Sequence, residues 1–241
     1  MPTTVLPIAT LLGLGLVFGL KHALDADHLA AVSTIVSESE SLFSSSVIGV
    51  LWGVGHTLSL LVVGVTVILL HVEVGARTAL ALEFCVALML IGLGADALRK
   101  LARGGRIHLH THEHHGRVHF HPHVHDGAPE PSDHTHHGFA LNLRPVLVGM
   151  VHGLAGSAAL MLLVLSTIPS PVLGLAYIGA FGIGSIGGML FMSALVALPA
   201  RLTAERFNRA HFAVRTLAAV FSLGFGLFMA YEIGIAGGLL L

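Results

Sequence analysis

Long apolar stretches alternate with short polar segments along most of this chain of 241 residues. A helix needs about 20 mostly apolar residues to cross the hydrocarbon core of a bilayer, and six segments reach that length. They are roughly residues 5–36, 47–70, 78–98, 145–168, 172–198 and 212–239. The pattern predicts an all-α polytopic membrane protein with six transmembrane helices.

The composition agrees with a lipid bilayer as the environment. Hydrophobic residues make up 54% of the chain and charged residues only 10%, whereas a soluble domain carries about 25% charged residues. The 29 glycines suit closely packed transmembrane helices. A formal net charge of −1 argues against a nucleic acid partner. Cys85 is the single cysteine, which excludes an intramolecular disulfide and a thiolate zinc site.

Two short motifs recur at nearly the same interval. The sequence G-L-K-H-A-L of residues 19–24 matches G-M-V-H-G-L of residues 149–154 at an offset of 130. Likewise, G-V-G-H of residues 53–56 matches G-I-G-S of residues 182–185. Three spans in each half force the two copies into opposite orientations, so we expect a 3+3 inverted repeat. Substrate sites in such repeats lie near the bilayer midplane, often at broken helices.

Positively charged residues predict the orientation in the membrane. The third loop carries Arg99, Lys100, Arg103, Arg106, Arg117 and Arg144, and four more arginines surround the fifth loop at positions 201, 206, 209 and 215. Only Arg77 falls on the opposite side. By the positive-inside rule, the third and fifth loops are cytoplasmic and both termini face outward. We therefore expect a multi-pass protein of the inner (cytoplasmic) cell membrane.

The third loop is rich in histidine. Residues 108–137 hold twelve of the eighteen histidines, mixed with Asp, Glu and Pro. Such a tract cannot bury a core and is predicted to be disordered, yet it can bind divalent metals loosely. A solvated linker or an expression tag are the alternatives, and the internal, irregular spacing disfavours a tag. The expected organisation is a repeat over 1–102, a His-rich cytoplasmic loop over 103–143, and a second repeat over 144–241.

A dense group of ionisable residues lies inside the first apolar span: Lys21, His22, Asp25, Asp27 and His28. Each such residue costs roughly 2.5–3.5 kcal/mol at membrane depth and is a functional candidate. Imidazole and carboxylate donors together suit a divalent transition metal. On an ideal helix His22, Asp25 and His28 share one face. Asp27 points away from that face, so either the helix is distorted or Asp27 orients a metal-binding histidine through a hydrogen bond without binding the metal itself.

Structural roles are the alternatives for these residues. Asp25 could form an i,i+4 salt bridge with Lys21, and the histidines could make interhelical hydrogen bonds. His56 follows two glycines that allow a close helix contact, which favours a metal-binding role over a packed core histidine. His152 occupies the place of His22 in the repeat, and with Ser157 it could complete the site from the other half.

The stretch H-A-L-D-A-D-H-L of residues 22–29 resembles the signature helix of the nickel/cobalt permease family, which reads H-A-x-D-A-D-H-I. W-G-V-G-H-T of residues 52–57 is similar to the second L-G-H-type motif of that family. The resemblance is strongest over residues 13–64 and is closest to the short branch of urease accessory permeases. It implies a carrier with Ni²⁺ or Co²⁺ as substrate, no bound cofactor, and a metallochaperone or nickel-enzyme maturation system as partner. It also implies that His22, Asp27 and His28 handle the metal and that His56 supports them.

The second half departs from the larger uptake permeases of that family. Those carry a motif of the type F-D-T-A-T-E, whereas residues 152–157 of this chain read H-G-L-A-G-S. The metal preference and the direction of transport stay open, with a lean to uptake. Export of zinc or another divalent metal is one alternative. The other is an intramembrane serine hydrolase using Ser157 and His152, which would leave the first-span cluster unexplained, so we expect no enzyme.

Overall fold

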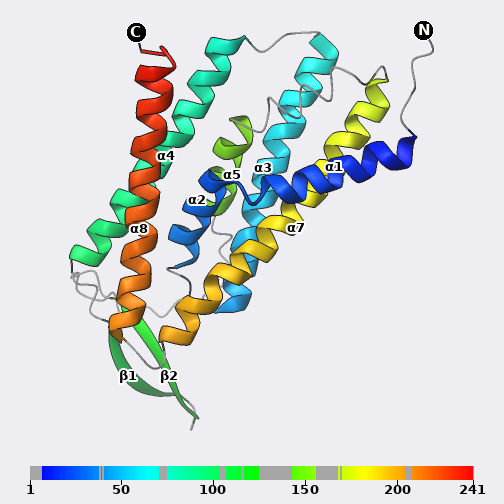
Figure 1. Cartoon of the computed structure of the whole chain (residues 1–241). Helices are drawn as coiled ribbons and strands as arrows, with labels where there is room; N and C mark the ends of the chain where they lie inside the picture. Colours follow the sequence, from blue (N-terminus) through cyan, green and yellow to red (C-terminus); the bar gives the residue numbers. More distant parts are fainter. Residues whose placement is uncertain are drawn as a thin grey trace.

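The computed structural model describes residues 7–37, 39, 41–70, 75–103, 107–114, 117–124, 143–155, 168, 170–204 and 208–240. Most of these residues are helical (Figure 1). The helices are α1 (Ile8–His22), α2 (Ala26–Val36), α3 (Leu42–Leu70), α4 (Ala76–Ala102), α5 (Arg144–Leu154), α7 (Pro171–Ala204) and α8 (Asn208–Tyr231), with the π-helical turn η1 (Glu232–Ala236) after α8. Two strands, β1 (Ile107–His114) and β2 (Arg117–Val124), complete the elements.

The long helices match most of the expected spans. Four helical segments are long and apolar enough to cross a bilayer: Leu42–Ile68, Ala76–Ala102, Pro171–Leu198 and Phe212–Ala236. The bent pair α1 and α2 supplies a fifth if it is counted as one span. The expected fourth span begins with α5, but residues 156–167 lie outside the described part of the chain. The multi-pass helical class is therefore confirmed, with up to five of six spans in the described residues.

The first span is broken next to the ionisable cluster. α1 and α2 meet at an angle of 57°. After α1 the backbone N–H groups of Leu24 and Asp25 donate to the carbonyls of Lys21 and His22, at 2.9 and 3.0 Å, in tight turns. Asp25 then takes an extended conformation and precedes the first residue of α2. Aspartate is a common residue at this position, but the Asp25 side chain makes no capping hydrogen bond and is left for another partner.

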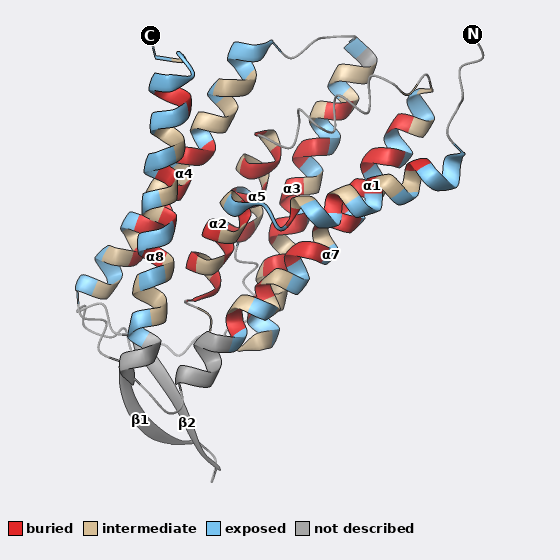
Figure 2. Ribbon diagram, in the orientation of Figure 1, coloured by how far each residue is buried: buried red, intermediate tan, exposed pale blue. Residues whose placement is uncertain are grey.

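The helices form two groups with α2 between them (Figure 1). α4 pairs with α8, while α3 packs against both α5 and α7, and α1 crosses α7. The short helix α2 contacts α4, α7 and α8. Buried residues gather on the faces that these helices turn toward one another (Figure 2). Exposed apolar side chains such as Leu217, Phe221 and Phe228 of α8 lie on the outer surface, where a bilayer supplies hydrocarbon.

Two glycines hold α1 against α7. The backbone carbonyl of Phe181 lies so close to Gly19 that a Cβ there would overlap it. The carbonyl of Leu16 lies equally close to Gly184. Small residues allow this backbone approach between membrane helices. Because α1 ends three residues after Gly19, the crossing also sets His22 against α7.

A second crossing of the same kind joins α3 and α5. Gly149 lies against the carbonyl of Trp52, and Gly55 lies against the carbonyl of Val146, again without room for a Cβ. His56 follows Gly55 directly, and His152 comes one helical turn after Gly149. The close approach of the two backbones therefore sets both imidazoles into the space between the helices.

The described part of the His-rich loop forms an antiparallel hairpin. β1 and β2 pair with Ile107 opposite Val124 and His114 opposite Arg117. The hairpin lies at the end of the molecule opposite the C-terminal end of α8 (Figure 1). Residues 125–142, which belong to the same predicted loop, lie outside the described residues. The loop is bounded by the end of α4 and the start of α5, which an ion pair between Asp96 and Arg144 joins at 3.2 Å.

Candidate metal site

The helix break places two histidine–carboxylate pairs side by side. Nδ1 of His22 is 2.7 Å from Oδ2 of Asp25, and Nδ1 of His28 is 3.1 Å from Oδ1 of Asp27. The same Asp27 oxygen accepts the backbone N–H of His28 at 2.9 Å. Metal-binding histidines commonly have a carboxylate on the ring nitrogen that does not bind the metal. Each pair therefore leaves the Nε2 atom available as a ligand.

Three histidines of the first half form one group. One ligand atom each of His22, His28 and His56 lies within 4.8 Å of the others. The His22 ring centroid is 4.4 Å from that of His28 and 5.1 Å from that of His56. Within the described residues, Nε2 of His22, Nε2 of His28 and both ring nitrogens of His56 are buried without a hydrogen-bond partner. A buried unpaired polar group costs about 1–3 kcal/mol, and a divalent metal ion would satisfy these nitrogens.

A second group joins the two halves of the chain. Ligand atoms of Asp27, His28 and His152 also lie within 4.8 Å of one another. Nε2 of His152, from α5, is 3.4 Å from Oδ2 of Asp27, and the His152 ring is 4.5 Å from that of His28. Asp27 therefore lies between two imidazoles, one from each half. His28 belongs to both groups.

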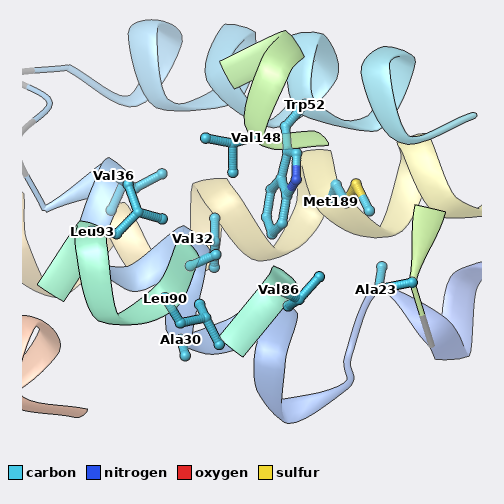
Figure 3. Close-up of a cluster of buried hydrophobic side chains, with 13 residues drawn as sticks. Ala23, Ala30, Val32, Val36, Trp52, Val86, Leu90, Leu93, Val148 and Met189 are labelled. Atoms are coloured by element: carbon cyan, nitrogen blue, oxygen red, sulfur yellow. The ribbon is translucent and has the colours of Figure 1, made fainter. Parts of the chain in front are cut away.

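Aromatic rings enclose the histidines. Trp52 stacks on His28 at 5.3 Å and meets His152 edge to face at 5.5 Å, while Phe181 lies 5.7 Å from His22. Trp52 is itself buried among apolar side chains, including Val148 and Met189 (Figure 3). An apolar shell of this kind keeps water from the ligands and strengthens their electrostatic interaction with an ion.

The sequence did not lead us to expect Trp52 and Phe181 at the site. Trp52 directly precedes the first glycine of the G-V-G-H motif, and Phe181 directly precedes the matching motif of the second half. The repeat is therefore the signal that could have pointed to both residues. An apolar aromatic residue in an apolar span is otherwise indistinguishable from ordinary core.

Five of the six candidate residues come together in the structure: His22, Asp27, His28, His56 and His152. Asp25 pairs with His22, not with Lys21, and its side chain is 51% exposed. Ideal helix geometry predicted that Asp25 lies on the same face as the histidines and that Asp27 points away from it. The break between α1 and α2 removes that geometry and brings Asp27 into the cluster. Ser157 lies outside the described residues.

Comparison with known proteins identifies a relative of nearly the same length. The chain is 38% identical over 237 residues to the urease accessory protein UreH of Bacillus sp. (strain TB-90). The match covers 96% of this chain and 95% of the relative. No family model matches the chain. No solved structure matches it either.

Proposed function

Because the chain belongs to the family of the urease accessory protein UreH, we propose that it is an integral membrane transporter of Ni²⁺ and/or Co²⁺. The observation that carries the proposal is the buried cluster of four imidazoles and Asp27 at a helix break inside an apolar bundle. Ionisable residues at such a depth usually mark an ion pathway. Urease is a nickel enzyme, so a membrane protein that assists it is expected to supply nickel. The maturation system of a nickel enzyme, or a metallochaperone, is then the partner on the cytoplasmic side.

The donor set narrows the choice of metal. Imidazole with carboxylate suits nickel, cobalt and zinc, whereas Cu(I) prefers thiolate and thioether ligands. Magnesium is bound mainly by oxygen ligands and would not call for four histidines. Zinc, carried outward, is the second candidate because the same imidazoles bind it well. The serine-hydrolase alternative has less support. His152, its proposed base, lies in the same group of possible metal ligands as Asp27 and His28.

Matching contacts in the two halves support an inverted repeat. Four positions of the first half correspond to positions 129 or 130 residues later: Leu16 to Val146, Gly19 to Gly149, Trp52 to Phe181, and Gly55 to Gly184. If each residue is replaced by its counterpart in the other half, every glycine contact of the α1–α7 crossing becomes a glycine contact of the α3–α5 crossing. The ring contact of His22 with Phe181 likewise becomes that of His152 with Trp52.

The α4–α8 pair supports the same symmetry within itself. Gly94 lies against Ala219 and Leu223, and Gly226 lies against Ala87 and Ile91. Each residue of the α4 side has its counterpart 132 positions later on the α8 side. Replacing every residue by its counterpart therefore turns the contact of Gly94 into that of Gly226, and the reverse. The counterparts are then α1 with α5, α3 with α7 and α4 with α8, and this correspondence supports a 3+3 inverted repeat. Such a repeat can alternate access by rocking one half against the other around a central site.

Transport assays test the function and its direction. In proteoliposomes we expect flux of radioactive nickel or cobalt that exceeds the flux of zinc. In metal-stressed cells an importer raises the nickel content and the sensitivity to nickel, whereas an exporter lowers both; import is expected. Zinc flux without nickel or cobalt flux would favour the zinc alternative. If the inserted protein carries none of the three metals, it is not a transporter of this kind. Fusing a reporter to each end tests the expected orientation, with both termini outside.

Deleting the His-rich loop is expected to leave transport measurable. Residues 108–137 follow α4 and precede α5, and none of the residues in the two ligand groups belongs to them. The deletion should change the apparent affinity or the regulation, because the loop would collect the metal on the cytoplasmic side. The measurement is the initial rate of nickel uptake over a range of concentrations. A deletion protein that inserts normally but carries no metal at any concentration would place the loop in the obligatory path.

A further inference from the structure

His28 contributes to both ligand groups, and this overlap leads to an inference that rests on the proposed transport function. We propose that the ion occupies two successive positions and passes between them across the ring of His28. The three-histidine position consists of His22, His28 and His56. The bridging position consists of Asp27, His28 and His152.

The two nitrogens of His28 suit two different positions. Nδ1 is at the bridging position, because it lies 3.1 Å from Asp27, whose other oxygen is 3.4 Å from Nε2 of His152. Nε2 is buried and has no hydrogen-bond partner within the described residues, which leaves it for the three-histidine position. The ring keeps one proton in either case, on the nitrogen that does not bind the metal. The handover therefore requires one proton to leave Nδ1 and one to be bound at Nε2, carried by a neighbouring acidic group or a water molecule, and it takes up none in total.

The two positions differ in charge. Three neutral imidazoles leave the full double charge on the ion in a buried site, which is costly in a low dielectric. The carboxylates of Asp25 and Asp27 offset part of this cost through the Nδ1 atoms of His22 and His28. In the bridging position Asp27 itself becomes a ligand and cancels one charge directly.

The positions also differ in which helices supply their ligands. The three-histidine position takes its ligands from α1, α2 and α3, all in the first half. The bridging position needs His152 of α5, in the second half. A shift of α5 relative to α2 would therefore make or break the bridging position without displacing a ligand of the three-histidine position. We expect equilibrium binding at the three-histidine position, because its ring nitrogens are buried without a hydrogen-bond partner within the described residues, whereas Asp27 and Nδ1 of His28 already contact each other. The bridging position then acts during transport.

Trp52 allows binding at the cluster to be measured in the intact chain. It is the single tryptophan, and its ring stacks on His28 at 5.3 Å. Quenching of its fluorescence by Ni²⁺ reports the cluster and not the His-rich loop. The experiment compares His56→Gln with His152→Gln in the purified full-length protein, and measures nickel flux by the same variants in proteoliposomes.

We expect His56→Gln, which removes one of the three ligands, to weaken nickel binding by roughly 100-fold or more, since even the loss of a residue behind a ligand costs about tenfold to 100-fold. His152→Gln is expected to bind nickel within about threefold of the wild type while its flux falls about tenfold or more. If His152→Gln weakens binding as much as His56→Gln, the ligands form a single site and the inference is wrong, although wild-type flux still supports the transport function.

Two further outcomes are decisive. Unchanged flux in His152→Gln would remove the bridging position from the path and overturn the inference. Wild-type protein that carries neither nickel nor cobalt would overturn the transport function together with it. A second variant, His152→Asn, and elution as a single folded species guard against a variant that fails through misfolding.

Discussion

Replacing His28 by glutamine is expected to reduce nickel or cobalt flux by roughly 100-fold or more. The physical reason is that His28 contributes to both ligand groups, so no alternative set of three donors remains within the described cluster. Its side chain is also 1% exposed and lies between Asp27, His56, His152 and Trp52. The measurement is the initial rate of radioactive nickel uptake into proteoliposomes.

The control for this prediction is Ser222→Ala. Ser222 is as fully buried as His28, but its hydroxyl donates to the carbonyl of Leu90 at 3.1 Å between α8 and α4. Its loss should cost about 1 kcal/mol of stability and leave transport near the wild-type rate. Wild-type flux in His28→Gln would contradict the assignment of the whole cluster as the metal pathway. Equal loss of flux in both variants would show that packing, and not metal binding, was disturbed.

Adding a single methyl group at Gly184 is expected to cost about 1–3 kcal/mol of stability or more. The Cβ of Gly184→Ala would overlap the backbone carbonyl of Leu16 and lie 3.0 Å from the backbone nitrogen of Leu20. Backbone atoms of a packed helix cannot rotate away as a side chain can, so α1 must move. Because α1 ends at His22, the three-histidine position should be disturbed with it. The expected results are a lower melting temperature and weaker nickel quenching of Trp52.

Gly187 is the matched control because it lies one helical turn further along α7. Within the described residues, no atom lies within 4 Å of the place that an added Cβ would take there. Gly187→Ala should keep the wild-type melting temperature, since the added methyl group meets open space and alanine favours the helix. A fall in melting temperature of equal size in both variants would indicate a general intolerance of α7 to alanine. An unchanged Gly184→Ala protein would show that the crossing of α1 and α7 is looser than the structure has it.

The sequence by itself determined the membrane class and most of the spans. Crossing a bilayer requires a local property, a run of about 20 apolar residues with internal hydrogen bonds, and such runs can be read directly from the chain. The sequence also singled out His22, Asp27, His28 and His56 as candidates, because ionisable residues within an apolar run stand out wherever the chain later folds. The repeat of the G-x-x-H motif pointed to His152 as the counterpart of His22.

Only the tertiary structure decided how these residues meet. The 57° break after α1 is seen only in the structure, since no proline or glycine in residues 22–27 announces it. That break exchanges the roles of the two carboxylates, placing Asp27 between His28 and His152 and leaving Asp25 on His22. Trp52 became part of the site because α3 closely approaches residues of α5 that lie over 90 positions away in the chain, and because its ring stacks on His28 of α2. Distances between segments so far apart are set by the sum of many side-chain contacts, which a local pattern of residues does not contain.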